Sequence, residues 1–365
     1  MNQLNLEQKL LILTSRLTFS EDDSAQIIEI AQEKNLNWFE FFKLALYHKT
    51  AVLCWINIKK IVDKKNIFSK YLNDAIYGIY VSQRKRNEMY QNEIGDVISK
   101  LQHMGVVCIP VKGVHLIPNM YKDLGVRYSG DADLLFKHSD IDKIENVMKS
   151  LNYIKGSYNA KENKVTPIDR VSEIKWKMFK GNLSDYIKVT DSEYCPFFKL
   201  DLRFALDDAL DKKPVEEIIN SFIDSKKINP SHILIHLCTH FYREAKNTVT
   251  IFYAKDMNLI KLCDIREYII QYMDNNVLRE CIDFAHKYNF EKHLYYTMFF
   301  LKLIYKDGYE QDIMDSLQIN DFGFLNTYGE NTKDEQYVFE KDFYQRLFSC
   351  GNQDLLENKP KFLQM

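Results

Sequence analysis

The stretch "YSGDADLLF", residues 128–136, decides the fold prediction because two acids stand inside what otherwise reads as a buried strand. Alternate positions from Ala132 to Phe136 are apolar, a period of two that is typical of a β-strand. Asp131 and Asp133 then project together from the opposite face, about 6 to 7 Å apart by the rise of a strand. Carboxylates at this distance repel each other and lose hydration, so we expect a divalent cation to offset the cost.

A second stretch, "FFKLDLRF" at residues 197–204, repeats this alternation. Its even positions are apolar, whereas Lys199, Asp201 and Arg203 occupy odd positions and are charged. If the two strands are neighbours, Asp201 joins the first two acids, and three carboxylates can hold the two Mg²⁺ ions used in phosphoryl or nucleotidyl transfer. The alternative interpretation is an ion pair of Asp201 with Lys199 or Arg203.

A glycine turn precedes the paired acids. The apolar run at residues 106–111 predicts a buried strand, and "VKGVHL" follows it and begins a helix. Gly113 would let a triphosphate approach the backbone, and Lys112 would add a positive charge beside the phosphates. Lys112 is otherwise an ordinary exposed lysine at a strand end.

Composition restricts the class of protein. Of 365 residues, 46% are hydrophobic and 27% are charged, which is ordinary for a globular protein. The net charge of −2 indicates neither a nucleic-acid nor a membrane partner. Seven scattered cysteines without a CxxC pair favour a reducing compartment, and we see no signal peptide and no long apolar run. We therefore expect a cytoplasmic protein.

The hydrophobic periodicity predicts an α+β protein in four consecutive segments. These are a helical N-terminal region (1–104), an α/β core (105–207), a helical C-terminal region (208–305) and an irregular or helical tail (306–365). Besides the strands above, the core is expected to contain a helix at 139–151 and strands at 173–179 and 186–190.

Three histidines, His232, His236 and His240, recur at every fourth position of a predicted helix. Two of them could bind zinc, but the third lies about 11 Å along the helix from the first. The H-E-x-x-H pattern that would add a general base is absent, so packed or solvated histidines are favoured over a metal site.

The order of strand, glycine turn, helix, paired acids and a later lone acid resembles a known superfamily. The motifs "CIPVKGVHL", "RYSGDADLLF" and "DLRF" are similar to those of the nucleotidyltransferases that include DNA polymerase β and the antibiotic-modifying enzymes. The closer resemblance is to the bacterial family often labelled "uncharacterised nucleotidyltransferase", over roughly residues 35–270. Two departures are that Gly113 precedes Val114 instead of a serine, and that Arg203 stands where the closer family often has a histidine.

This resemblance implies a polymerase β-like core and transfer of a nucleotidyl group, dependent on Mg²⁺ or Mn²⁺, from a nucleoside triphosphate such as ATP. The acids would be both catalytic residues and metal ligands, and four further residues would contact the nucleotide, although Arg127 could instead brace the strand. The implied catalytic residues are Asp131, Asp133 and Asp201, and the implied nucleotide-binding residues are Lys112, Gly113, Arg127 and Gly130.

The acceptor is not identified by the sequence. A hydroxyl or phosphate on a small molecule or a peptide natural product fits the near-neutral charge better than nucleic acid does. Three alternatives remain: a non-catalytic nucleotide-binding protein of the same fold, a toxin-like tRNA nucleotidyltransferase, and a glycosyltransferase using the paired acids.

Overall fold

The structure is a computed structural model that describes residues 4–62, 67–207, 210–253, 255–329 and 337–349. The chain divides into two compact units. Unit 1 combines Met1–Ile76 with Leu237–Met365, and unit 2 is Tyr77–His236. These units differ from the four consecutive segments expected from the sequence, because the helices α5 (Lys70–His103) and α10 (Pro230–Lys246) each run through a boundary between units.

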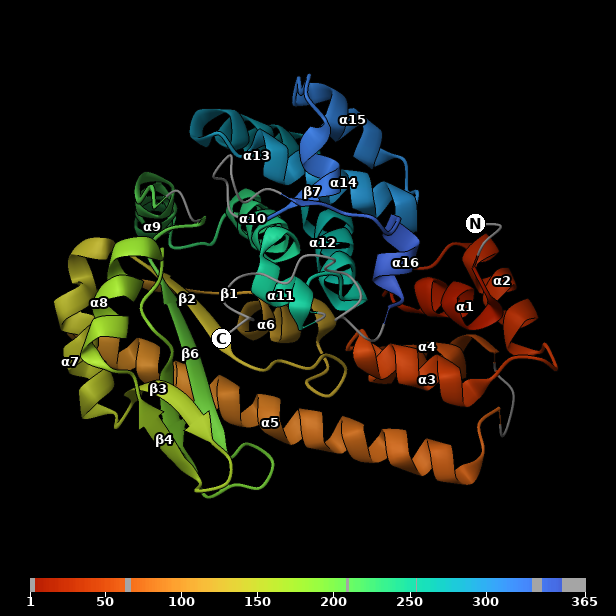
Figure 1. The fold of residues 1–365 in the computed structure, drawn as a ribbon, viewed down its shortest axis with the longest axis horizontal. Coiled ribbons are helices and arrows are strands. Elements are labelled where there is room, and N and C mark those ends of the chain that lie inside the picture. The colour runs from red at the N-terminus through yellow and green to blue at the C-terminus, as the bar shows by residue number, and fades with distance from the viewer. Residues whose placement is uncertain (1–3, 63–66, 208–209, 254, 330–336, 350–365) are drawn as a thin grey trace. The chain divides into compact units, whose positions relative to one another are not determined.

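Unit 2 contains a mixed six-stranded sheet, so the α+β class is confirmed. The strand order is β1-β2-β6-β5-β3-β4, and only β2 and β6 pair in parallel. Figure 1 shows this sheet with α7 and α8 beside it. The strands are β1 (Cys108–Val111), β2 (Ala132–Phe136), β3 (Ile154–Asn159), β4 (Lys164–Pro167), β5 (Tyr186–Val189) and β6 (Phe197–Arg203). The helices are the greater part of α5, α6 (Gly113–Leu116), a π-helical turn (Ile117–Tyr121), a 3-10 turn (His138–Asp140), α7 (Ile141–Ser150), α8 (Arg170–Phe179) and α9 (Lys213–Ser225).

The core of unit 2 lies on one face of the sheet. The even-numbered residues of β2 and β6 are buried there, as the alternation predicts, and they pack against α5 and α7 in one hydrophobic cluster. Tyr90 and Ile94 of α5 and Ile144 and Met148 of α7 belong to this cluster. The two strands that carry the acids therefore rest on a packed layer that keeps their odd-numbered residues on the other face.

The opposite face of β2 is also covered, which the alternating pattern did not predict. All five residues of the strand are buried, and α9 packs against it. Asp133 is only 1% exposed. Its carboxylate is therefore far more desolvated than one at a solvated strand end.

One predicted strand, residues 173–179, is wrong because it lies in the helix α8. The Asp169 side chain accepts hydrogen bonds from the backbone N–H groups of Val171 and Ser172, both at 3.0 Å, and so caps the helix. Val171 and Ile174 stay exposed. The alternation of apolar and polar residues here is thus a helix surface and not the two faces of a strand.

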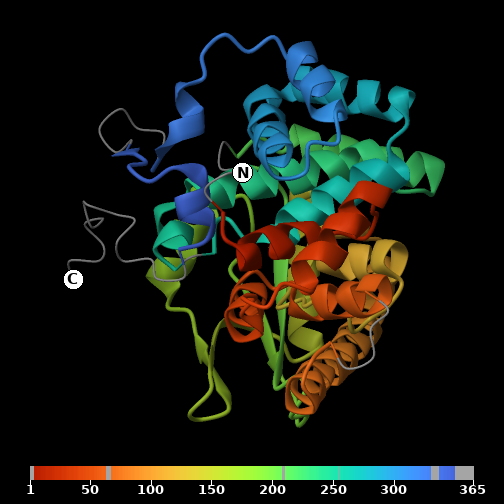
Figure 2. The same cartoon turned by 90° about the vertical axis from the view of Figure 1, so that its right-hand side faces the viewer.

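Unit 1 is mainly helical. Figure 2 shows its N-terminal helices in red and its C-terminal helices in teal and blue. The Asn258 side chain donates to the backbone oxygen of Tyr47 at 3.0 Å, and the backbone N–H of Leu17 donates to Glu267 at 2.9 Å. Such bonds join parts of the chain that are more than 200 residues apart. The first helices are α1 (Leu6–Thr14), α2 (Glu21–Ala31), α3 (Trp38–Tyr47) and α4 (Ala51–Val62). The later elements are α11 (Thr248–Phe252), α12 (Leu259–Tyr272), α13 (Asn275–Tyr288), α14 (Glu291–Ile304), α15 (Tyr309–Ser316), a 3-10 turn (Gly323–Asn326), β7 (Thr327–Tyr328), β8 (Tyr337–Val338) and α16 (Phe343–Leu347).

Candidate active site

The acids of the two predicted strands lie next to each other in unit 2. Asp133 of β2 is the direct register partner of Asp201 of β6, across the one parallel strand pair of the sheet. Asp131 immediately precedes β2, and both Asp131 and Asp201 act on Asp133 electrostatically. Strand register therefore brings together three carboxylates that are up to 70 positions apart in the sequence.

Burial dominates the electrostatics of Asp133. The pKa of this carboxyl is raised to about 7, chiefly by desolvation and also by the charges of Asp131 and Asp201, against the opposing effect of Lys112. Lys112 Nζ lies 2.6 Å from Asp133 Oδ1. The predicted nucleotide-side lysine is therefore not a free surface group, because its ammonium neutralises the most buried acid of the site.

Asp201 is held by polar contacts on both carboxylate oxygens. The Asn182 side chain donates to Oδ1 at 2.7 Å, and Arg203 Nη1 donates to Oδ2 at 3.3 Å. Trp176 Nε1 in turn donates to Asn182 at 3.2 Å and fixes the orientation of the amide. The ion pair with Arg203 is thus present, and the asparagine is a contact that no sequence motif indicated.

A fourth acid, Asp185, was missed by the sequence analysis. It precedes β5, and Lys199 Nζ lies 2.6 Å from its Oδ2. Burial raises the pKa of Asp185, and the charges of Asp201 and Asp131 act in the same direction. Lys199 therefore pairs with Asp185 and not with Asp201. Only a chain turn before a neighbouring strand marks this position, and many acids share that feature.

The glycine turn is closely packed against the segment that precedes Asp131. A Cβ on Gly113 would lie 2.2 Å from Ser129 Oγ and 2.7 Å from Arg127 Nη1, so glycine allows these side chains to reach the backbone. Lys112 has φ +52°, which is strained for a residue with a side chain. The structure thus places the predicted residues Lys112, Gly113 and Arg127 together. It also places the Ser129 hydroxyl beside Gly113. In the sequence, Val114 follows Gly113 where the superfamily has a serine.

Two side chains of α5, Arg86 and Tyr90, hold the segment before Asp131 against the sheet. The sequence analysis did not identify either residue. Arg86 donates to the backbone oxygens of Ser129 at 3.0 Å and Gly130 at 3.1 Å. The Tyr90 hydroxyl donates to the Gly130 oxygen at 3.2 Å and accepts from the backbone N–H of Lys199 in β6 at 3.0 Å. One buried tyrosine therefore links the backbone beside Asp131 to the strand that carries Asp201. Gly130 contributes a backbone oxygen to this link.

The donor set suits a hard cation, because it consists of carboxylates. Among the residues that the structure describes, no three His, Cys, Asp or Glu side chains are arranged as a metal cluster. Asp133 is instead paired with Lys112, and Asp201 with Arg203. Asp133 is almost fully desolvated and is repelled by both Asp131 and Asp201. These carboxylates nevertheless fit a divalent cation, which would take over the compensation that the basic side chains now provide.

The predicted histidine row lies on the helix α10. His232 and His236 are buried, in agreement with the predicted packing role. His240 Nε2 lies 3.5 Å from Glu244 Oε1. The six cysteines in the described residues are buried free thiols. Within the same described ranges, no helix is both long and apolar enough to cross a membrane.

The fold and the acids define an α+β protein with carboxylates on adjacent parallel strands, beside a glycine turn. The chain belongs to the family described as "Uncharacterised nucleotidyltransferase", whose model matches residues 34–306. The resemblance inferred from the sequence motifs is thereby confirmed. This membership supports a general role in nucleotidyl transfer with a nucleotide as one substrate. No curated protein and no solved structure matches the chain.

Proposed function

We propose that this chain is an enzyme that transfers a nucleoside monophosphate from a nucleoside triphosphate to an acceptor hydroxyl or phosphate, on a polymerase β-like core. The observation that carries the proposal is the register pairing of Asp133 with Asp201, with Asp131 close enough to act on Asp133 electrostatically. Family membership supports the reaction class.

In this proposal Asp131, Asp133 and Asp201 would hold Mg²⁺ or Mn²⁺. The bound cation would neutralise phosphate charge and lower the pKa of the acceptor hydroxyl. Lys112 would then be released from its ion pair with Asp133 to contact the triphosphate. The backbone at Gly113 would allow the phosphates to approach closely.

The remaining groups would orient the triphosphate and deprotonate the acceptor hydroxyl. Arg127 and Ser129, which lie against Gly113, would donate hydrogen bonds to phosphate oxygens. The acceptor oxygen attacks the α-phosphorus, the bond to the β-phosphate bridging oxygen breaks, and pyrophosphate leaves. Asp201 would accept the proton of an acceptor hydroxyl, and Asn182 would keep its carboxylate oriented.

The acceptor is proposed to be a small molecule or a peptide natural product, because the net charge of −2 gives no excess of positive charge for nucleic acid. A toxin-like tRNA nucleotidyltransferase and a non-catalytic nucleotide-binding protein are the competing functions.

The test is incubation of the full chain with each α-labelled nucleoside triphosphate, Mg²⁺ and a cell extract, followed by separation of small molecules, peptides and RNA. We expect label in a small-molecule or peptide fraction, no transfer from γ-labelled triphosphate, and no transfer by Asp131→Asn. Asp142→Asn, an exposed acid on α7, is the matched control and should retain activity. Label in tRNA would favour the toxin-like function. Nucleotide binding without any transfer would overturn the enzymatic proposal.

A further inference from the structure

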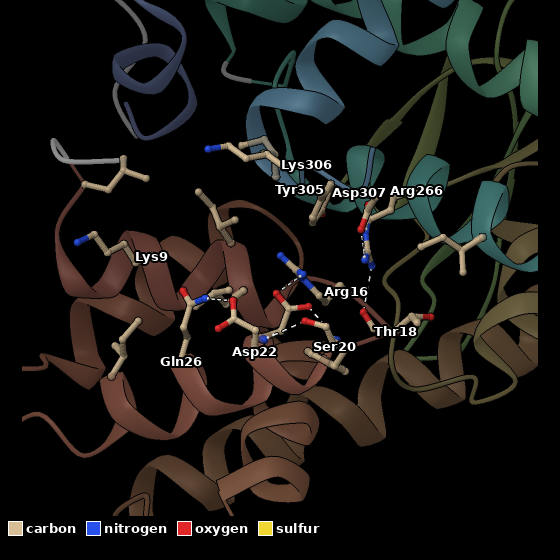
Figure 3. A pocket seen from close by; sticks show the side chains of 18 of the residues that line it. Lys9, Arg16, Thr18, Ser20, Asp22, Gln26, Arg266, Tyr305, Lys306 and Asp307 are labelled. Atoms are coloured by element: carbon tan, nitrogen blue, oxygen red, sulfur yellow. Dashed lines mark hydrogen bonds and ion pairs between the residues drawn. The ribbon is translucent and has the colours of Figure 1, made fainter. Parts of the chain in front are cut away.

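Unit 1 contains a cavity of about 770 Å³ that the proposed nucleotidyl transfer does not use. All of its lining residues belong to unit 1. One wall comes from α1 and α2, and the other from α12 and the residues between α14 and α15 (Figure 3). The residues from α1 and α2 precede residue 34, where the match to the family begins. A volume of this size accommodates a small organic ligand.

Part of the cavity wall is apolar. Ile12, Leu13 and Ile304 are buried side chains that line it, whereas Ile270 lines it while remaining 39% exposed. A ligand that covered Ile270 would remove apolar surface from water, which favours binding by roughly 25 cal/mol per Å². The apolar wall therefore fits a ligand with a hydrocarbon body.

The polar part of the cavity contains a buried arginine that is incompletely paired. Arg16 is 3% exposed, and its Nη1 lies 2.7 Å from Asp23 Oδ1. Its Nε–H has no hydrogen-bond partner among the described residues. The guanidinium also lies 5.1 Å from the ring centroid of Tyr305. Since a guanidinium has five N–H donors, one carboxylate leaves it with unused donor capacity.

A second buried arginine in the same cavity provides the contrast. Arg266 makes two hydrogen bonds to Asp307, at 2.6 and 2.7 Å, and a third bond to Glu267 at 2.5 Å. It also donates to the backbone oxygen of Thr18 at 3.1 Å. Four of the five N–H donors of Arg266 are thus used within the protein, whereas Arg16 has a single ion pair within the described part of the chain and keeps more of its donors for a ligand.

The charge of the lining indicates an anion. Of the described residues that line the cavity, four are cationic and three are acidic, which leaves one positive charge in excess. Figure 3 shows Lys9, Arg16 and Lys306 around the cavity. Asp22 and Asp23 both have partners within the protein. Asp22 accepts a hydrogen bond from the Gln26 side chain at 2.6 Å, and Asp23 forms an ion pair with Arg16. One excess charge suits a monoanion better than a phosphate dianion.

We propose that this cavity binds a small organic carboxylate with an apolar body, whose head group contacts Arg16 and the ammonium groups of Lys9 and Lys306. The hydrocarbon body lies against Ile270 and the buried aliphatic wall. The inference does not depend on the nucleotidyl transfer proposed above.

The test uses sodium decanoate as the probe and the full chain as the receptor, by isothermal titration calorimetry below the concentration at which decanoate forms micelles. We expect saturable one-site binding, and binding of 1-decanol at least tenfold weaker. Lys9→Gln combined with Lys306→Asn should weaken decanoate binding about tenfold and leave decanol binding unchanged. Asparagine is chosen at position 306 because Lys306 has φ +60°, a conformation that asparagine tolerates.

Three further variants test the apolar wall, provide a control outside the cavity and test the guanidinium. Ile270→Trp should narrow the cavity along its apolar wall and weaken binding of both probes, and Lys43→Gln, on an exposed part of α3 outside the cavity, should bind like the wild type. Arg16→Gln should abolish decanoate binding if it folds; if it does not, the test rests on the double variant of Lys9, which is partly buried, and Lys306, which is exposed. Absence of decanoate binding, equal binding of decanol, or an unchanged affinity in the double lysine variant would overturn the proposal.

Discussion

Replacing Asp133 by asparagine should remove transferase activity and should make the variant gain stability relative to the wild type as the pH of the metal-free protein is raised. Burial raises the pKa of Asp133 to about 7 from the ordinary 3.8, a difference worth about 4 kcal/mol between the two protonation states. Between these pKa values the folded state binds more protons than the unfolded state. The free energy of unfolding of the wild type therefore falls as the pH rises through this range.

The variant does not titrate at this position, so it should gain stability relative to the wild type as the pH rises. From pH 5 to pH 8 this relative gain should be about 2 to 3 kcal/mol, since most of the titration lies in that interval. Loss of the ion pair with Lys112 lowers the stability of the variant at both pH values, because a partly buried ammonium loses its partner. The change with pH is therefore the decisive quantity, and not the absolute stability.

The assay is urea denaturation of wild type and Asp133→Asn at both pH values in EDTA, which removes bound divalent cations. Asp142→Asn, an exposed acid of the same unit, serves as the control and should follow the wild type at both pH values. Parallel stability curves for wild type and Asp133→Asn would refute the argument from burial. Retained Mg²⁺-dependent turnover would remove Asp133 from the proposed active site.

Three other variants test separate contacts. Asp201→Ala should keep its affinity for a non-hydrolysable nucleoside triphosphate with Mg²⁺ within tenfold, roughly 1.4 kcal/mol by calorimetry, yet lose most of its turnover; normal turnover would exclude it from the site. Tyr90→Phe should lower the free energy of unfolding by about 1 to 3 kcal/mol, because the partly buried backbone N–H of Lys199 loses its acceptor, and should also reduce turnover; an unchanged rate would show that this link does not position the acids. Burial lowers the pKa of His48 to about 3, so the unfolded state binds the extra proton and stability should fall as the pH drops below 6.5. His48→Gln should remove up to about 5 kcal/mol of this acid sensitivity in urea denaturation, and an unchanged pH dependence would contradict it.

The strands of the proposed catalytic core could be predicted because their alternation reflects one buried face. The even positions of 132–136 and 198–204 pack against α5 and α7, and such a pattern has few other physical solutions. Residues 173–179 show the limit of this reasoning. Their alternation is equally regular, but the cap formed by Asp169 and the exposure of Val171 and Ile174 belong to a helix.

By itself, the sequence determined the α+β class and the family, and it singled out the acids that the proposed function uses, because motif order and periodicity are local properties of the chain. Only the tertiary structure decided that Asp133 faces Asp201, that Lys112 pairs with Asp133, and that Tyr90 links the two segments. It also decided the cavity around Arg16, whose walls are more than 200 residues apart in sequence. Such contacts depend on strand register and on burial of several segments at once, and no short stretch of sequence encodes either.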